Sequence, residues 1–295
     1  MKSLATSSVR LENIVQDLSL LVKARLSLMV VFTTFVGFLL GNRSGMEYVL
    51  LAATLIGTAL SACGAAALNQ WWERNFDARM PRTQSRPLPA GRLHPGDAFL
   101  LGLLFSVIGI AILALLVNLL SALLAALTIL SYLFVYTPMK QRSSLNTLVG
   151  AIPGALPPLI GYAASQNRLG LEGWILFFIL WFWQMPHFLA IAWMYRDQYA
   201  DAGFIMLSKN DESGKMTSRQ ALIYSAFLLP ISLLPTAVGL SNTFYAIAAF
   251  VLGLAFLMKS LAFVKQRSIG RARSLFFTSV IYLPLLLGVL LITRR

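Results

Sequence analysis

Cysteine, histidine and acidic residues are scarce in this chain of 295 residues. A single cysteine, Cys63, excludes a disulfide framework and a cysteine-based metal centre. Charged residues make up 12% of the sequence, whereas an ordinary soluble domain has about 25%. The chain is therefore not a soluble globular protein. Only 11 acidic residues oppose 24 basic ones, an excess that would suggest nucleic acid binding in a soluble chain.

Long apolar runs account for the composition, which is 58% hydrophobic. A transmembrane helix needs about 20 mostly apolar residues, and nine such runs fit the chain. Asn118 and the pair Ser241-Asn242 mark two tight hairpins between runs. The sequence predicts an all-α polytopic membrane protein with spans at about 24–41, 48–70, 96–117, 119–139, 146–165, 173–194, 219–240, 242–263 and 273–293.

The basic residues predict the orientation of these spans by the positive-inside rule. With the N-terminus inside, 20 of the 24 basic residues fall on the cytoplasmic side, so topology explains the charge and we expect no nucleic acid partner. Arg43, Arg168, Arg294 and Arg295 fall outside, and the last two, at a periplasmic C-terminus, are the awkward ones. The chain then divides into a cytoplasmic segment, 1–23, and one transmembrane domain, 24–295.

The acidic residues are clustered, with seven of the 11 in two predicted cytoplasmic connections. Asn69, Glu73 and Asp77 are four residues apart at the end of the second span, so a continuing helix places them along one face. Asp197 and Asp201, again four apart, follow the sixth span. Mg²⁺ is usually held by one or two carboxylates together with substrate phosphates, and these two stripes supply hard oxygen ligands on the same side of the membrane.

Basic side chains accompany the acidic stripes and would complement the charge of a diphosphate. They are Arg74, Arg79, Arg82, Arg86, Lys140 and Arg142. The alternative interpretation is that these groups are interfacial caps and ion pairs. Ionisable groups at membrane depth cost roughly 2.5–3.5 kcal/mol each on insertion scales, which favours a functional site.

Several motifs resemble one known family. The first is Asn69-x-x-Trp-Glu73-Arg-x-x-Asp77-x-x-Met-x-Arg82-Thr-x-x-Arg86-Pro-Leu. The other motifs are Tyr136-Thr137 with Lys140, Arg142 and Asn146; Gly154-Ala-Leu-Pro157-Pro158-Leu-Ile-Gly161; Trp183-Gln-Met-Pro186-His187-Phe188; and Tyr199-x-x-Ala-Gly203-x-x-Met206-Leu207. The set resembles the UbiA-type intramembrane prenyltransferases, and Gln70 with Glu73 is similar to their heme-modifying branch, the protoheme IX farnesyltransferases or heme O synthases.

The resemblance implies a fold and a reaction. The fold is a bundle of nine transmembrane helices around a central cavity. The reaction is transfer of a farnesyl group from farnesyl diphosphate to a vinyl group of heme b, giving heme O, with Mg²⁺ as cofactor and heme b as substrate. Asn69, Glu73 and Asp77 would hold one metal ion, and Asp197 and Asp201 another. Diphosphate contacts would come from Arg82, Arg86, Lys140 and Arg142, and less strongly from Arg25.

Other side chains have two open interpretations each. His187, in the sixth span, is a candidate for heme contact or a buried histidine bonded to a helix carbonyl that Pro186 leaves free. The second histidine, His94, is interfacial. Glycines and prolines of the fifth span either open a heme-sized gap or allow close helix packing. Trp71, Trp72, Tyr132 and Tyr136 could stabilise a carbocation through their π faces, or form an interfacial belt.

Three other functions compete with this one. A secondary transporter also has broken helices, but no inverted repeat is apparent and the acids lie at one face. A prenyltransferase acting on an aromatic quinone precursor is the nearer rival. A non-catalytic assembly factor for a terminal oxidase leaves both acidic stripes unexplained. We expect a multi-pass protein of the bacterial inner membrane, in the lipid bilayer, with heme A synthase or terminal oxidase assembly as possible partners.

Overall fold

The structure is a computed structural model that describes residues 13–42 and 45–295. Residues 1–12 of the predicted N-terminal segment and Arg43 lie outside the described residues. A short helix at 13–21 precedes the first span. Within the described part, nine helices are long and apolar enough to cross a membrane. They are α2 (Ala24–Gly41), α3 (Tyr48–Asp77), α4 (Pro95–Leu116), α5 with η1 and α6 (Leu119–Met139), α7 (Asn146–Gln166), α8 (Leu171–Met194), α10 (Lys215–Ala237), α11 (Thr243–Lys265) and α12 (Ile269–Ile292).

The predicted spans are confirmed, including the two tight hairpins. Asn118 is the N-cap of α5, where its side-chain oxygen accepts the N–H of Ser121. Asn242 is the N-cap of α11 in the same way, with the N–H of Tyr245 as its donor. A cap side chain of this kind satisfies one of the orphan N–H groups of the first helical turn. Each asparagine therefore starts a new helix within a few residues of the end of the previous one.

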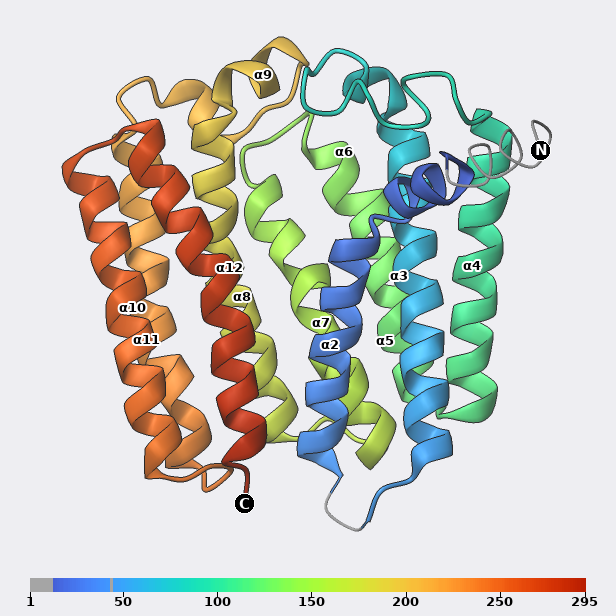
Figure 1. Ribbon diagram of the computed structural model, residues 1–295, viewed down its shortest axis with the longest axis vertical. Helices are drawn as coiled ribbons and strands as arrows, with labels where there is room; N and C mark the ends of the chain where they lie inside the picture. The colour runs from blue at the N-terminus through green and yellow to red at the C-terminus, as the bar shows by residue number, and fades with distance from the viewer. Residues whose placement is uncertain (1–12, 43–44) are drawn as a thin grey trace, which may run out of the picture.

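The helices form an upright bundle in which successive helices run in opposite directions (Figure 1). One end of the bundle carries the helix at 13–21, the 78–94 connection, α6 and the short helix α9 (Arg196–Asp201). We call this the site end. The C-terminus lies at the opposite end. As predicted, α3 continues beyond its apolar part to Asp77, so its last turns reach the site end.

Close packing explains part of the glycine and proline content of α7. A Cβ on Gly161 would collide with the carbonyl oxygen of Thr34 in α2, and one on Gly37 would collide with the carbonyl of Pro158. Only glycine allows this approach of two helix backbones. Nearer the site end, Gly150, Pro153, Gly154 and Pro157 line a cavity. One part of α7 therefore packs closely against α2, as the second interpretation predicted, and another part lines the cavity.

The fourth span is irregular at the site end. Its residues Ser131–Tyr136 form a π-helical segment, η1, between α5 and the single turn α6 (Thr137–Met139). π-Helical turns are rare and are found frequently at functional sites. The segment stacks the rings of Tyr132 and Tyr136 with centroids 5.6 Å apart, and both rings line the cavity.

Candidate active site

A cavity of about 360 Å³ opens among the helices. Its walls combine two kinds of surface. Charged and phenolic side chains from the site end form one part, including Lys23, Glu73, Asp77, Arg82, Arg86, Lys140 and Tyr199. Apolar and small side chains from inside the bundle form the other part, including Ala62, Ala65, Ile129, Pro157, Ile160 and Leu180. The cavity can therefore hold a ligand with a charged head and a long apolar tail.

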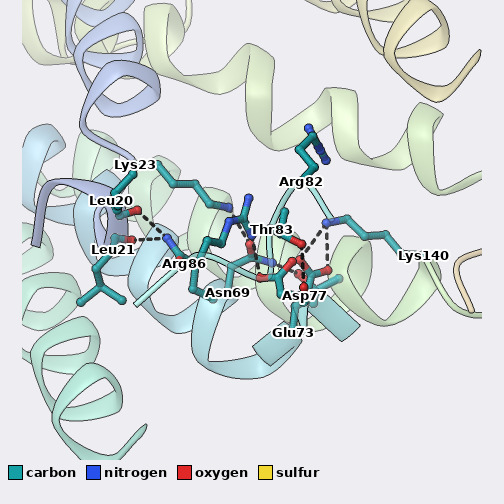
Figure 2. Close-up of polar contacts among 12 residues, drawn as sticks. Leu20, Leu21, Lys23, Asn69, Glu73, Asp77, Arg82, Thr83, Arg86 and Lys140 are labelled. Carbon is teal, nitrogen blue, oxygen red and sulfur yellow. Dashed lines mark hydrogen bonds and ion pairs between the residues drawn. The ribbon is translucent and has the colours of Figure 1, made fainter. Parts of the chain in front are cut away.

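The last two turns of α3 place two carboxylates in the wall, each with a basic partner (Figure 2). Lys140 Nζ donates to Glu73 Oε1 at 2.8 Å, and Arg86 Nη1 donates to Asp77 Oδ2 at 2.6 Å. Glu73 and Asp77 are 4% and 3% exposed. A carboxylate this deeply buried needs such a partner, because desolvation of an unpaired charge is costly. Burial lowers the pKa of Lys140, but the Glu73 carboxylate outweighs it and raises the pKa above the ordinary value.

Asn69 belongs to the same face of α3 and is fully buried. Its Oδ1 accepts a hydrogen bond from Lys23 Nζ at 2.7 Å, and its Nδ2 donates to Thr137 Oγ1 at 3.1 Å. The Thr137 hydroxyl in turn donates to the Tyr132 carbonyl at 2.8 Å. Because a carbonyl only accepts and a hydroxyl has one proton, Thr137 can only accept from Asn69. This chain directs the oxygen of the Asn69 amide towards Lys23, which lines the cavity, whereas Asn69 itself does not.

Lys23 lies in the cavity wall, where Arg25 was expected as a weaker diphosphate contact. No sequence motif pointed to Lys23. Lys23 has a left-handed backbone (φ 48°) at the N-cap of α2, where the chain turns from the helix at 13–21 into the bundle. The turn directs the Lys23 side chain into the cavity wall, whereas Arg25 is exposed and does not line the cavity. Burial lowers the pKa of Lys23 to about 7, and the neighbouring Arg86 and Lys140 act in the same direction.

The second acidic stripe lies apart from the first in this structure. Asp197 and Asp201 are exposed residues of α9, and neither lines the cavity. Arg142 is also exposed and outside the cavity wall. The helix α9 also contributes Tyr199, whose hydroxyl accepts a hydrogen bond from Arg82 Nη2 at 2.9 Å. Arg82 therefore lies where the structure brings α9 to the mouth of the cavity.

The residues of the first stripe suit Mg²⁺ in chemical type. Two carboxylates and an amide oxygen are hard ligands on one helix face. Among the described residues, no three His, Cys, Asp or Glu side chains lie close enough to hold a metal ion by themselves. A Mg²⁺ ion bound to Glu73 and Asp77 would therefore need further oxygen ligands, which a diphosphate provides.

His187 enters the apolar part of the cavity wall from α8. Its ring stacks on Trp183, with centroids 5.1 Å apart, and its Nδ1 lies 2.7 Å from Ser279 Oγ in α12. The second histidine, His94, is the N-cap of α4 and is exposed, where its Nδ1 accepts the N–H of Gly96. Of these two, His187 is therefore the one available to a ligand in the cavity.

Comparison with solved structures shows which class this fold defines. The chain superposes on a structure of digeranylgeranylglyceryl phosphate synthase with a TM-score of 0.79, 14% identity and coverage of 95% of this chain and 98% of that one. A UbiA homolog from Archaeoglobus fulgidus bound to DMAPP and Mg²⁺ gives 0.64 and 15%, covering 93% and 99%. At these identities the likeness shows the fold alone, a multi-pass bundle of membrane helices.

Sequence comparison gives the family. The sequence model described as the UbiA prenyltransferase family matches residues 30–281. The protoheme IX farnesyltransferase of Solibacter usitatus is 46% identical over 283 residues, covering 93% of this chain and 97% of the relative. That of Opitutus terrae is 47% identical over 275 residues, covering 93% of each. The chain belongs to the UbiA prenyltransferase family, as the motifs indicated.

Proposed function

We propose that this protein transfers a farnesyl group from farnesyl diphosphate to a vinyl group of heme b, giving heme O. The observation that supports the proposal best is the composition of the cavity wall, with paired acids and bases at the site end and an apolar interior that contains His187. An allylic diphosphate fits the first part by charge and the second by its hydrocarbon chain. Two relatives, from Solibacter usitatus and Opitutus terrae, are named protoheme IX farnesyltransferase and are similar over almost their whole length.

The first step is ionisation of the allylic diphosphate. The bond between C1 of the farnesyl group and the diphosphate oxygen breaks, and the electron pair stays on the diphosphate. Arg82, Arg86, Lys140 and Lys23 are the cations of the cavity wall that would stabilise this charge. Bound Mg²⁺ supplies further stabilisation of the leaving group. We propose Asn69, Glu73 and Asp77 as its ligands, because they lie along one face of α3 and both carboxylates line this wall. Asp197 and Asp201, exposed on α9, stay a prediction as ligands of a second ion.

The second step joins the two substrates. The π electrons of the heme vinyl group attack C1 of the farnesyl cation and form a carbon–carbon bond. Water then adds to the cation left beside the porphyrin ring and loses a proton, which gives a hydroxyethylfarnesyl group. The rings of Tyr132 and Tyr136 both line the cavity. We propose that the π faces of these rings shield the farnesyl cation.

The remaining parts of the proposal concern placement in the cell. We propose that residues 1–23 form a cytoplasmic segment before the membrane domain at 24–295. The positive-inside count supports our proposal that the site end lies in the cytoplasm and the C-terminus in the periplasm of a bacterial inner membrane. Heme A synthase or terminal oxidase assembly stays a prediction as a partner. Arg142 and Arg25 stay predictions as diphosphate ligands, with the structure favouring Lys23 over Arg25.

Diphosphate release by the purified protein tests which molecule accepts the farnesyl group. With farnesyl diphosphate and Mg²⁺ present, heme b should stimulate release and an aromatic quinone precursor should not. Stimulation by the aromatic precursor alone would replace heme with a different acceptor on the same fold. Release that neither acceptor stimulates, in protein shown to be folded, would argue against the transferase itself.

A further inference from the structure

A serine outside all the sequence motifs contacts His187. Ser279 lies on α12 and is fully buried. Its Oγ is 2.7 Å from His187 Nδ1 and also donates to the carbonyl oxygen of Phe276, one turn earlier, at 2.5 Å. The carbonyl of Ser279 accepts the indole N–H of Trp183 at 2.8 Å. One residue of α12 therefore holds two neighbouring side chains of α8.

The direction of these hydrogen bonds decides the tautomer of His187. A serine hydroxyl has one proton, and a carbonyl oxygen can only accept. The proton of Ser279 is donated to Phe276, so the hydroxyl can only accept from the imidazole. Nδ1 of His187 must then bear the hydrogen. In the neutral ring, Nε2 is left without a hydrogen and with a free lone pair.

Aromatic neighbours hold the plane of the imidazole ring. Its centroid lies 5.1 Å from that of Trp183 with an interplanar angle of 23°, and 5.0 Å from that of Phe276 at 32°. The Trp183 ring is itself anchored by its hydrogen bond to Ser279. A histidine that binds a metal almost always donates its second ring N–H to a fixed acceptor, which sets both tautomer and orientation. His187 has this arrangement in the wall of the cavity.

We infer that His187 Nε2 binds the heme iron as an axial ligand and that Ser279 is the positioning residue that prepares it. The inference rests on the proposed function, because it takes heme as the substrate. Ligation at His187 would fix the porphyrin in the apolar part of the cavity, while the charged wall at the site end holds the diphosphate. No proton leaves His187 in this role, and the iron does not change its oxidation state.

Absorption spectroscopy of heme added to the purified full-length protein tests the inference without turnover. Wild-type protein should bind heme b with a shifted Soret band. His187→Ala should lose that band position, and free imidazole should restore it by entering the space left by the side chain. Ser279→Ala should weaken heme binding about 10-fold, the lower end of the usual effect of losing a metal ligand's outer partner.

Two matched controls separate ligation from general damage. His94→Ala removes the second histidine of the chain, an exposed one, and should leave the heme spectrum unchanged. Ser225→Ala removes another buried serine hydroxyl, bonded to Ser260 and outside the cavity wall, and should leave heme affinity unchanged. An unaltered Soret band in folded His187→Ala would overturn the ligation but not the substrate. Failure of wild-type protein to bind heme would overturn both the ligation by His187 and the proposed function.

Discussion

Lys140 Nζ lies 2.8 Å from Glu73 Oε1 and joins the connection after α6 to the last turns of α3. The residue Lys140 is also fixed through its backbone, because its carbonyl accepts the N–H of Ile205 at 2.6 Å. Three segments far apart in the sequence therefore meet at this ion pair. An enzyme that ionises a diphosphate needs cations and acids placed in advance at one point, and this junction supplies both.

Asp77→Asn should reduce turnover by at least about 100-fold, the effect typical of losing one preorganised electrostatic contact. The amide keeps an oxygen for Arg86 Nη1, so the apparent melting temperature in detergent should change little. Asp97→Asn is the matched control, since Asp97 is exposed in the first turn of α4. Wild-type turnover in Asp77→Asn would remove that residue from the metal site.

Asp201→Asn tests whether α9 joins the site during the reaction. If α9 moves so that Asp201 binds metal, the variant should need about 10-fold more Mg²⁺ for half-maximal activity, comparable to the effect of weakening a metal ligand. Turnover measured against Mg²⁺ concentration gives this value. An unchanged Mg²⁺ requirement would confine the metal site to the residues of α3.

Thr137→Val should weaken Mg²⁺ binding, although Thr137 does not line the cavity. The variant leaves Asn69 Nδ2 buried without its acceptor, which costs about 1–3 kcal/mol and frees the amide to rotate. We expect the Mg²⁺ concentration for half-maximal activity to rise about 10-fold. Thr137→Ser restores the hydroxyl and should restore the wild-type value. A requirement equal to wild type in the valine variant would show that Thr137 does not orient Asn69.

Lys23→Met should raise the KM for farnesyl diphosphate more than Arg25→Met does. Loss of one charge-assisted hydrogen bond, worth about 1.5–3 kcal/mol, predicts an increase of about 10-fold or more for Lys23. Arg25 is exposed, so its removal should act weakly through surface charge. Steady-state kinetics on both variants give the two KM values for comparison. A larger effect at Arg25 would return the diphosphate contact to Arg25, the weaker candidate of the sequence analysis.

Asp211 predicts an acid-dependent loss of stability. Burial acts to raise the pKa of its carboxyl, but hydrogen bonds from the N–H of Thr217, at 2.7 Å, and from Ser213 lower the pKa overall. A lowered folded-state pKa means that the stabilisation is complete above the unfolded value of about 3.9 and is lost as pH falls through the folded value. Asp211→Asn should lower the stability at pH 7, because the neutral amide accepts weaker hydrogen bonds than the carboxylate.

Apparent melting temperatures of wild-type and Asp211→Asn protein across pH 3–7 give the comparison. The difference between the two proteins should shrink as the wild-type carboxyl is protonated. A difference that stays constant down to pH 3 would show that the charge of Asp211 does not stabilise the start of α10.

The spans could be predicted from sequence because apolar length and cap residues are local properties. Asn118 and Asn242 start their helices through contacts three residues away. The face of α3 could also be predicted, since helical spacing alone aligns Asn69, Glu73 and Asp77. These features require no knowledge of the tertiary fold.

The choice between Lys23 and Arg25 could not be predicted in this way. The choice depends on the left-handed backbone of Lys23, with φ 48°, which directs the Lys23 side chain and not that of Arg25 into the cavity wall. The role of Ser279 depends on the packing of α12 against α8, 92 residues apart along the chain from His187. The exposed positions of Asp197 and Asp201 on α9 likewise follow from the path of the chain after α8, which the spacing of the two aspartates does not determine.

The mass of heme recovered after reaction tests the central claim most directly. Purified protein is incubated with heme b, farnesyl diphosphate and Mg²⁺, and the extracted heme is analysed by mass spectrometry. The account predicts heme heavier by one farnesyl group and one hydroxyl group, absent when Mg²⁺ is chelated. Unchanged heme beside consumed farnesyl diphosphate, in folded protein, would contradict it.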